Sequence, residues 1–102
     1  MVDATNAYWT NSVSPAGVMM VPLSGGTPVS LASGSDPLGI AVDTTYVYWA
    51  DYNANTVNEV SLGGGPPVTL VSGQSGANGM ASDETSLYWT NDLGGTVMKL
   101  AK

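Results

Sequence analysis

Short stretches of alternating apolar and polar residues run through the whole chain, a pattern that is typical of β-strands. In the middle of the sequence, β-prone runs cover residues 39–43, 47–50, 57–62 and 68–71, and Gly, Pro, Asn and Asp separate them. The separating segments consist of residues that accept turn dihedral angles. No segment shows a helical period of useful length. The pattern predicts four short antiparallel strands, named A, B, C and D in chain order.

This four-strand unit recurs along the chain. A Tyr-Trp pair returns every 40 residues, each time five residues after an Asp and just before a short polar segment. The segment Pro-Val-Ser-Leu at 28–31 returns as Pro-Val-Thr-Leu at 67–70, a spacing of 39 that places one extra residue in a loop. Four strands per unit of about 40 residues are typical of a β-propeller blade. The repeated aromatic positions are Tyr8, Trp9, Tyr48, Trp49, Tyr88 and Trp89.

The repeat divides the chain into one complete and two partial blades, about 2.5 blades in a single repeat domain. We expect strands B, C and D over 1–34, strands A to D over 35–73, and strands A, B and C over 74–102. The first unit is thus predicted to lack strand A and the last to lack strand D. Such an open arc leaves sheet edges and blade faces uncovered.

Self-association is the expected remedy, because repeats bury their faces only against neighbouring repeats. We expect a homo-oligomer, with a homodimer favoured. Two chains supply six blades, with incomplete blades at both junctions between the chains. If the strands at the junctions are reassigned, the same two chains supply five complete blades. The alternative is that the chain is an excised or engineered piece of a longer propeller.

The repeated Tyr-Trp-Thr-Asn and Tyr-Trp-Ala-Asp segments, each preceded by a strand similar to Gly-Ile-Ala-Val-Asp, resemble YWTD repeats. These repeats build the six-bladed propellers of the low-density lipoprotein receptor class B type, and the resemblance covers nearly the whole chain. It implies an extracellular or cell-surface binding or structural module without catalytic activity, although looser relatives include calcium-dependent lactonases. Asn11 and Asn91 stand where the family pattern has Asp. No signal peptide is recognised at the N-terminus.

The Tyr-Trp motif has a structural interpretation of its own. Adjacent residues of a strand point to opposite faces, so Tyr48 and Trp49 are predicted to contact two different neighbouring blades. The polar residue that follows, Asn11, Asp51 or Asn91, is expected to end strand B and to hydrogen-bond turn backbone.

Composition narrows the range of functions. The chain of 102 residues has two Lys, no Arg and eight Asp plus Glu, a net charge of -6, so we expect no nucleic-acid partner and no anionic membrane surface. No apolar run approaches the roughly 20 residues of a membrane span, and a soluble chain is expected. The absence of Cys and His excludes thiolate nucleophiles, imidazole bases, disulfides and the usual zinc ligands.

The expected ligand position is the mouth of the central channel, where the D–A and B–C loops lie. Their side chains offer oxygen atoms, the ligands that calcium prefers, but the order D-x-[DN]-x-[DN]-G of a calcium loop is absent, so no cofactor is assigned. Tyr52 is a candidate for sugar stacking or a protein contact, unless it folds back on a neighbouring blade. The candidate residues are Asp36, Asp51, Tyr52, Asn53, Asn78, Asn91 and Asp92.

These observations favour a non-catalytic, self-assembling propeller scaffold or binding module. One alternative is a calcium-dependent, lactonase-like hydrolase, which needs inward acidic side chains where strand A offers Ile40, Val42 and Met80. The other is a carbohydrate-binding propeller, which would repeat an aromatic residue at one loop position, whereas Ser12 and Asp92 match Tyr52.

Overall fold

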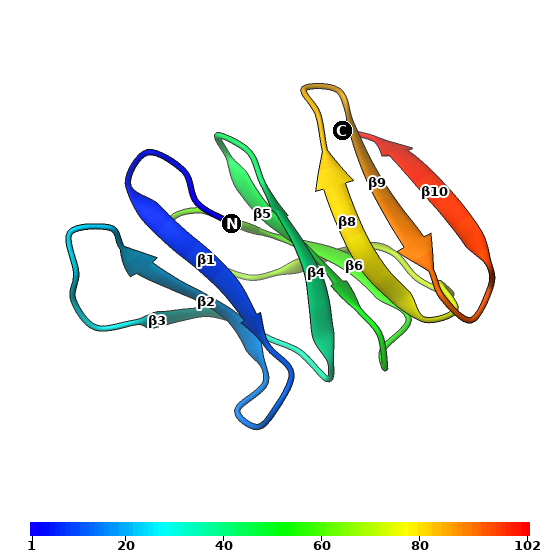
Figure 1. Cartoon of the computed structure of the whole chain (residues 1–102), viewed down its shortest axis with the longest axis horizontal. Coiled ribbons are helices and arrows are strands. Elements are labelled where there is room, and N and C mark those ends of the chain that lie inside the picture. Colours follow the sequence, from blue (N-terminus) through cyan, green and yellow to red (C-terminus); the bar gives the residue numbers. More distant parts are fainter.

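The computed structural model describes residues 1–102 and contains only strands, grouped in three antiparallel sheets that lie side by side (Figure 1). The all-β class predicted from the sequence is confirmed, and open sheets of three or four strands fit partial blades. None of the chain forms a helix that is long and apolar enough to cross a membrane. The strands are β1 (Asn6–Asn11), β2 (Gly17–Pro22), β3 (Val29–Ser33), β4 (Pro37–Val42), β5 (Tyr46–Asp51), β6 (Thr56–Ser61), β7 (Val68–Val71), β8 (Ala77–Ser82), β9 (Ser86–Asn91) and β10 (Thr96–Ala101).

Each sheet joins strands that are neighbours in the sequence. The first sheet has the order β1-β2-β3, the second β4-β5-β6-β7 and the third β10-β9-β8. The register shifts at the same place in two sheets, between Val18 and Met19 where β2 pairs with β3, and between Val57 and Asn58 where β6 pairs with β7. The sequence repeat is therefore also a repeat of backbone geometry.

The N-terminus adds a short backbone contact at the edge of β1. Val2 forms an antiparallel bridge with Ala7, and Met1 and Tyr8 exchange two backbone hydrogen bonds of 2.7 and 3.1 Å. In the second sheet the equivalent residues at the end of β4 pair with β5 in the same way. Met1 and Val2 thus occupy the last two positions of a strand A. A run of two residues is too short for its pattern to predict a strand.

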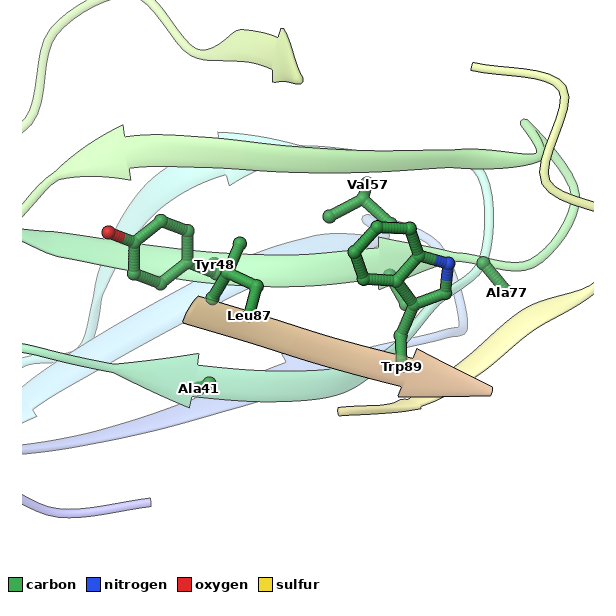
Figure 2. Packing of buried hydrophobic residues seen from close by; sticks show 7 residues of the cluster. Ala41, Tyr48, Val57, Ala77, Leu87 and Trp89 are labelled. Carbon is green, nitrogen blue, oxygen red and sulfur yellow. The ribbon is translucent and has the colours of Figure 1, made fainter. Parts of the chain in front are cut away.

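Two hydrophobic clusters fill the spaces between the sheets. One packs Trp49 of β5 against Tyr8 and Val18 of the first sheet, and the other packs Tyr48 of β5 against Trp89 and Leu87 of β9. Figure 2 shows the second cluster, with the side chains of Leu87 and Trp89 lying beside Tyr48 and Val57. Tyr48 and Trp49 therefore contact different neighbours, as their adjacent positions in the strand predict.

The innermost strands of the second and third sheets approach each other closely. Any side chain at Gly39 of β4 would overlap the backbone carbonyl of Asn78 in β8, so this contact requires glycine. The repeat places Gly79 at the same position of β8. A Cβ atom at Gly79 would have only one heavy atom within 4 Å, the hydroxyl oxygen of Thr90 at 3.3 Å. Gly79 of the third sheet is therefore equivalent to Gly39, but no further sheet packs against it in this chain.

Candidate functional site

An aspartate organises the turn that connects β4 to β5. One carboxylate oxygen of Asp43 accepts hydrogen bonds from the backbone N–H groups of Thr45 and Tyr46, at 2.8 and 2.7 Å. The other oxygen accepts the hydroxyl hydrogen of Tyr48, at 2.7 Å. This Asp–Tyr clamp ties the turn to the following strand and uses the tyrosine hydroxyl inside the fold.

The other two turns of this kind contain the same clamp. The hydroxyl groups of Tyr8 and Tyr88 donate to Asp3 and Asp83, each at 2.8 Å, and two backbone N–H groups complete each arrangement. The repeat aligns these aspartates in the sequence, but their contact with the tyrosine is seen only in the structure. Their constant position five residues before the tyrosine was the signal that identifies the clamp.

The clamps change the ionisation of their members. Burial raises the pKa of Asp43, but hydrogen bonds from the Tyr46 N–H and the Tyr48 hydroxyl outweigh it and lower that pKa from 3.8 to about 2. Hydrogen bonds lower the pKa of Asp3 and Asp83 to about 2 as well, first through the backbone N–H two residues further along the chain. Burial and the Asp43 carboxylate raise the pKa of Tyr48.

These pKa values predict a loss of stability in acid. A carboxylate with a lower pKa in the folded than in the unfolded state stabilises the fold above pH 4, and the contribution disappears as the pH falls towards 2. Urea unfolding monitored by circular dichroism should therefore give a lower midpoint at pH 2.5 than at pH 7. The variant Asp43→Asn should lose less between these two pH values, because it has one titrating clamp fewer. A midpoint that is constant from pH 7 to pH 2 would contradict the clamps.

The three clamped turns surround a surface depression of about 930 Å³. Four carboxylates and one cation line it, and the Lys102 ammonium lies 3.0 Å from Asp43 and donates to the backbone carbonyl of Asp83, at 2.7 Å. Strand direction places this depression at the opposite end of the sheets from the D–A and B–C loops, where the sequence analysis expected the ligand. The clamp carboxylates accept hydrogen bonds from their own turns and tyrosines. Their presence around the depression is therefore explained by the structure of the turns.

At the expected end of the sheets, Asp51 joins the D–A loop to the B–C loop. Its carboxylate is 2% exposed and accepts hydrogen bonds from the N–H groups of Ser35, Asp36 and Ala54, at 2.8, 3.1 and 3.0 Å. The prediction that the residue after the Tyr-Trp motif hydrogen-bonds turn backbone is confirmed here. Asp36, a second candidate, contributes its backbone to this arrangement and is half-buried.

Asn91 occupies the same position in the third sheet with different partners. Its amide donates to the side-chain oxygen of Gln74, at 2.9 Å, and the Trp89 indole N–H donates to the same oxygen, at 3.1 Å. Gln74 was not among the residues singled out from the sequence; it lies in the D–A loop between β7 and β8. Since Gly34 holds the equivalent backbone position in the preceding loop, the buried indole N–H of Trp49 has no acceptor.

The other candidates remain near the surface and do not converge. Tyr52 is half-buried, and its ring lies beside Gly76 of the next loop. A Cβ atom added to Gly76 would be 3.1 Å from a ring carbon of Tyr52. Asn53 is exposed, and Asn78 donates to Asp92 at 2.6 Å. Tyr52 therefore lies against the neighbouring sheet, the second of the two positions considered for it.

Several oxygen-bearing side chains of the loops are already engaged inside the fold. The chain contains no group of three or more acidic side chains placed to hold a metal ion. Asp51 already accepts three backbone hydrogen bonds, and Asn91 presents its amide N–H groups to its neighbours. Asp51 and Asn91 therefore contribute to loop structure in this fold.

Two sheet faces remain uncovered at the ends of the row. On the first sheet, the Trp9 face, formed by Ala7, Trp9, Met19 and Val21, points away from the second sheet, because Tyr8 points towards it. On the third sheet, the Tyr88 face, formed by Ala81, Tyr88, Thr90 and Val97, points away in the same way. Neither face has a neighbouring sheet within the chain.

No protein-family model matches the sequence, and a search of curated proteins found no match.

Proposed function

We propose that this protein is a non-catalytic propeller scaffold or binding module that completes its ring by self-association. The observation that carries the proposal is the relation between the two uncovered faces. The chain already packs a Tyr face against a Trp face twice, once between each pair of neighbouring sheets. The Tyr88 face of one copy and the Trp9 face of another are the two halves of a third such interface.

The exposed fractions support this relation. Trp49 and Trp89 are each 2% exposed, whereas Trp9, at the same position of the repeat, is only half-buried. Val18 and Val57 are 0% exposed, whereas the equivalent Val97 is 78% exposed. A second copy packed in the same manner would cover both residues and recover their hydrophobic contribution.

In a closed dimer the Tyr88 face of each copy meets the Trp9 face of the other, so the two contacts are related by two-fold symmetry. Two copies provide six sheets, the number of blades in the propellers that the repeat resembles, so a homodimer is the proposed assembly. The same resemblance supports an extracellular or cell-surface location. The hydrolase alternative has weaker support because the loops lack a calcium ligand set. The carbohydrate alternative relies on Tyr52, part of whose ring lies against the next loop.

Light scattering on the size-exclusion peak tests the proposal. We expect twice the chain mass of 10.4 kDa for the native sequence and the mass of one chain for Val97→Asp, because a carboxylate would be buried in the new interface. The matched control is Val68→Asp, which changes an exposed valine on the middle sheet and should leave the dimer intact. A native chain that stays monomeric, or a Val97→Asp variant that stays dimeric, would refute this assembly.

A further inference from the structure

The outer edge of β10 has no partner strand. In the first and second sheets, the third strand of the unit pairs on both sides, β2 with β1 and β3, and β6 with β5 and β7. In the third sheet β10 pairs only with β9. A ring of two chains would cover sheet faces and leave this edge open. An open edge presents backbone N–H and C=O groups that accept another strand.

We propose that the edge of β10 binds an extended peptide as a fourth, antiparallel strand. The chain provides the template for this contact twice, in β3 and β7. Both template strands pair antiparallel, and both shift register after the second residue of the strand that holds them. The equivalent shift in the third sheet falls between Val97 and Met98 of β10, so the peptide would contribute a bulge there.

The template strands also define the chemistry of the peptide. Both follow a proline, begin with valine, continue with a small hydroxyl residue and then have leucine, at Leu31 and Leu70. These leucines pack against the hydrophobic clusters between sheets, so apolar side chains at this position add to the main-chain pairing. In the second sheet Glu59 of β6 pairs with Val68 of β7. The residue at the Glu59 position in the third sheet is Lys99. An acidic residue at the valine position would therefore pair with Lys99 across the strands.

This contact is the peptide-recognition mode known as β-strand addition, in which main-chain hydrogen bonds give affinity and alternate side chains give selectivity. The partner is thus an extended segment with the pattern Pro-Val-Ser/Thr-Leu, or its variant with an acidic residue in place of valine. The main-chain pairing stands apart from ring closure because it uses an edge, whereas ring closure uses faces. The leucine contact would use the Tyr88 face, because Leu31 and Leu70 lie on the Tyr8 and Tyr48 faces of their sheets.

Fluorescence anisotropy with a labelled peptide of residues 63–73 tests the inference on the 102-residue chain. We expect saturable binding, and binding about tenfold or more weaker for the peptide carrying Thr69→Pro, because proline removes a main-chain donor and disrupts strand pairing. The peptide with Val68→Glu should bind more tightly than the unmodified peptide to the native chain, and this preference should reverse on Lys99→Glu. No saturation up to about 1 mM peptide would overturn the proposal.

Amide hydrogen exchange locates the contact. Added peptide should slow the exchange of outward-facing backbone amides in β10 and leave those of β6, which already pairs on both sides with β5 and β7, unchanged. Protection elsewhere with none in β10 would also overturn the proposal. Light scattering on the same samples separates the two proposals: a monomer that binds peptide refutes the dimer and supports strand addition, and a dimer that does not bind refutes strand addition alone.

Discussion

Replacing Trp49 with alanine is expected to lower the free energy of unfolding by about 3–5 kcal/mol, the usual cost of truncating a buried aromatic side chain. Trp49 is 2% exposed and packs against Tyr8, Val18 and Val60, so its removal leaves a cavity between the first two sheets. A loss of this size is a large part of the stability of an ordinary domain, about 5–15 kcal/mol. Urea unfolding followed by circular dichroism measures it.

Trp9→Ala is the matched control, since the repeat gives both tryptophans the same position in their sheets. Trp9 is only half-buried, so its loss should cost clearly less when both variants are measured at a concentration where the chain is monomeric. Trp49→Phe, which retains an aromatic ring, keeps the comparison usable if Trp49→Ala does not fold. Equal losses of unfolding free energy for Trp9→Ala and Trp49→Ala would contradict the structure, in which Trp49 is packed between two sheets and Trp9 lies on an uncovered face.

The variant Asp51→Ala is expected to lower the free energy of unfolding by about 3 kcal/mol or more. It removes the acceptor of three backbone N–H groups, on Ser35, Asp36 and Ala54, and hydrogen bonds to a charged group contribute about 1.5–3 kcal/mol each. The loss should appear as a lower midpoint in urea unfolding at pH 7. It should also loosen the D–A loop, which amide exchange at Ser35 and Asp36 would register.

Asp51→Asn is the control that the chain itself suggests, because Asn11 and Asn91 stand at this position in the other two copies. Asparagine retains one acceptor oxygen, so its cost should lie between those of the native residue and alanine. Asp92→Ala, at an exposed loop position, should change stability by less than about 0.5 kcal/mol. An Asp51→Ala variant as stable as Asp92→Ala would show that the three N–H groups find water instead.

The periodic features of the fold could be predicted from the sequence. The Tyr-Trp pairs recur at constant spacing, and alternation along a strand is enough to direct Tyr48 and Trp49 to different neighbours. All ten strands follow from the same pattern. The strand remnant at Met1 and Val2 could not be predicted, since two residues have no period of their own and pair only because β1 is present.

The candidate site was harder to predict than the fold. Loop residues rich in oxygen suggested ligands, but whether a side chain faces solvent or its own backbone depends on contacts across the fold. Asp51 accepts hydrogen bonds from a loop some 15 residues earlier, and Gln74 accepts from Trp89 and Asn91 in a later strand. The Asp–Tyr clamps are local and regular, and their spacing was visible in the sequence.

The short reach of these clamps has a consequence for folding kinetics. Each Asp–Tyr hydrogen bond closes a loop of only five residues, so a hairpin such as β4–β5 can form before its sheet meets a neighbour. Hairpins form within microseconds, whereas contacts between sheets must wait for longer segments of chain to meet. Substituting phenylalanine at Tyr48 should therefore slow refolding of this hairpin as well as speed unfolding. The repeated aspartate would then help to start folding at one turn in each of the three sheets, the turn that precedes the Tyr-Trp strand.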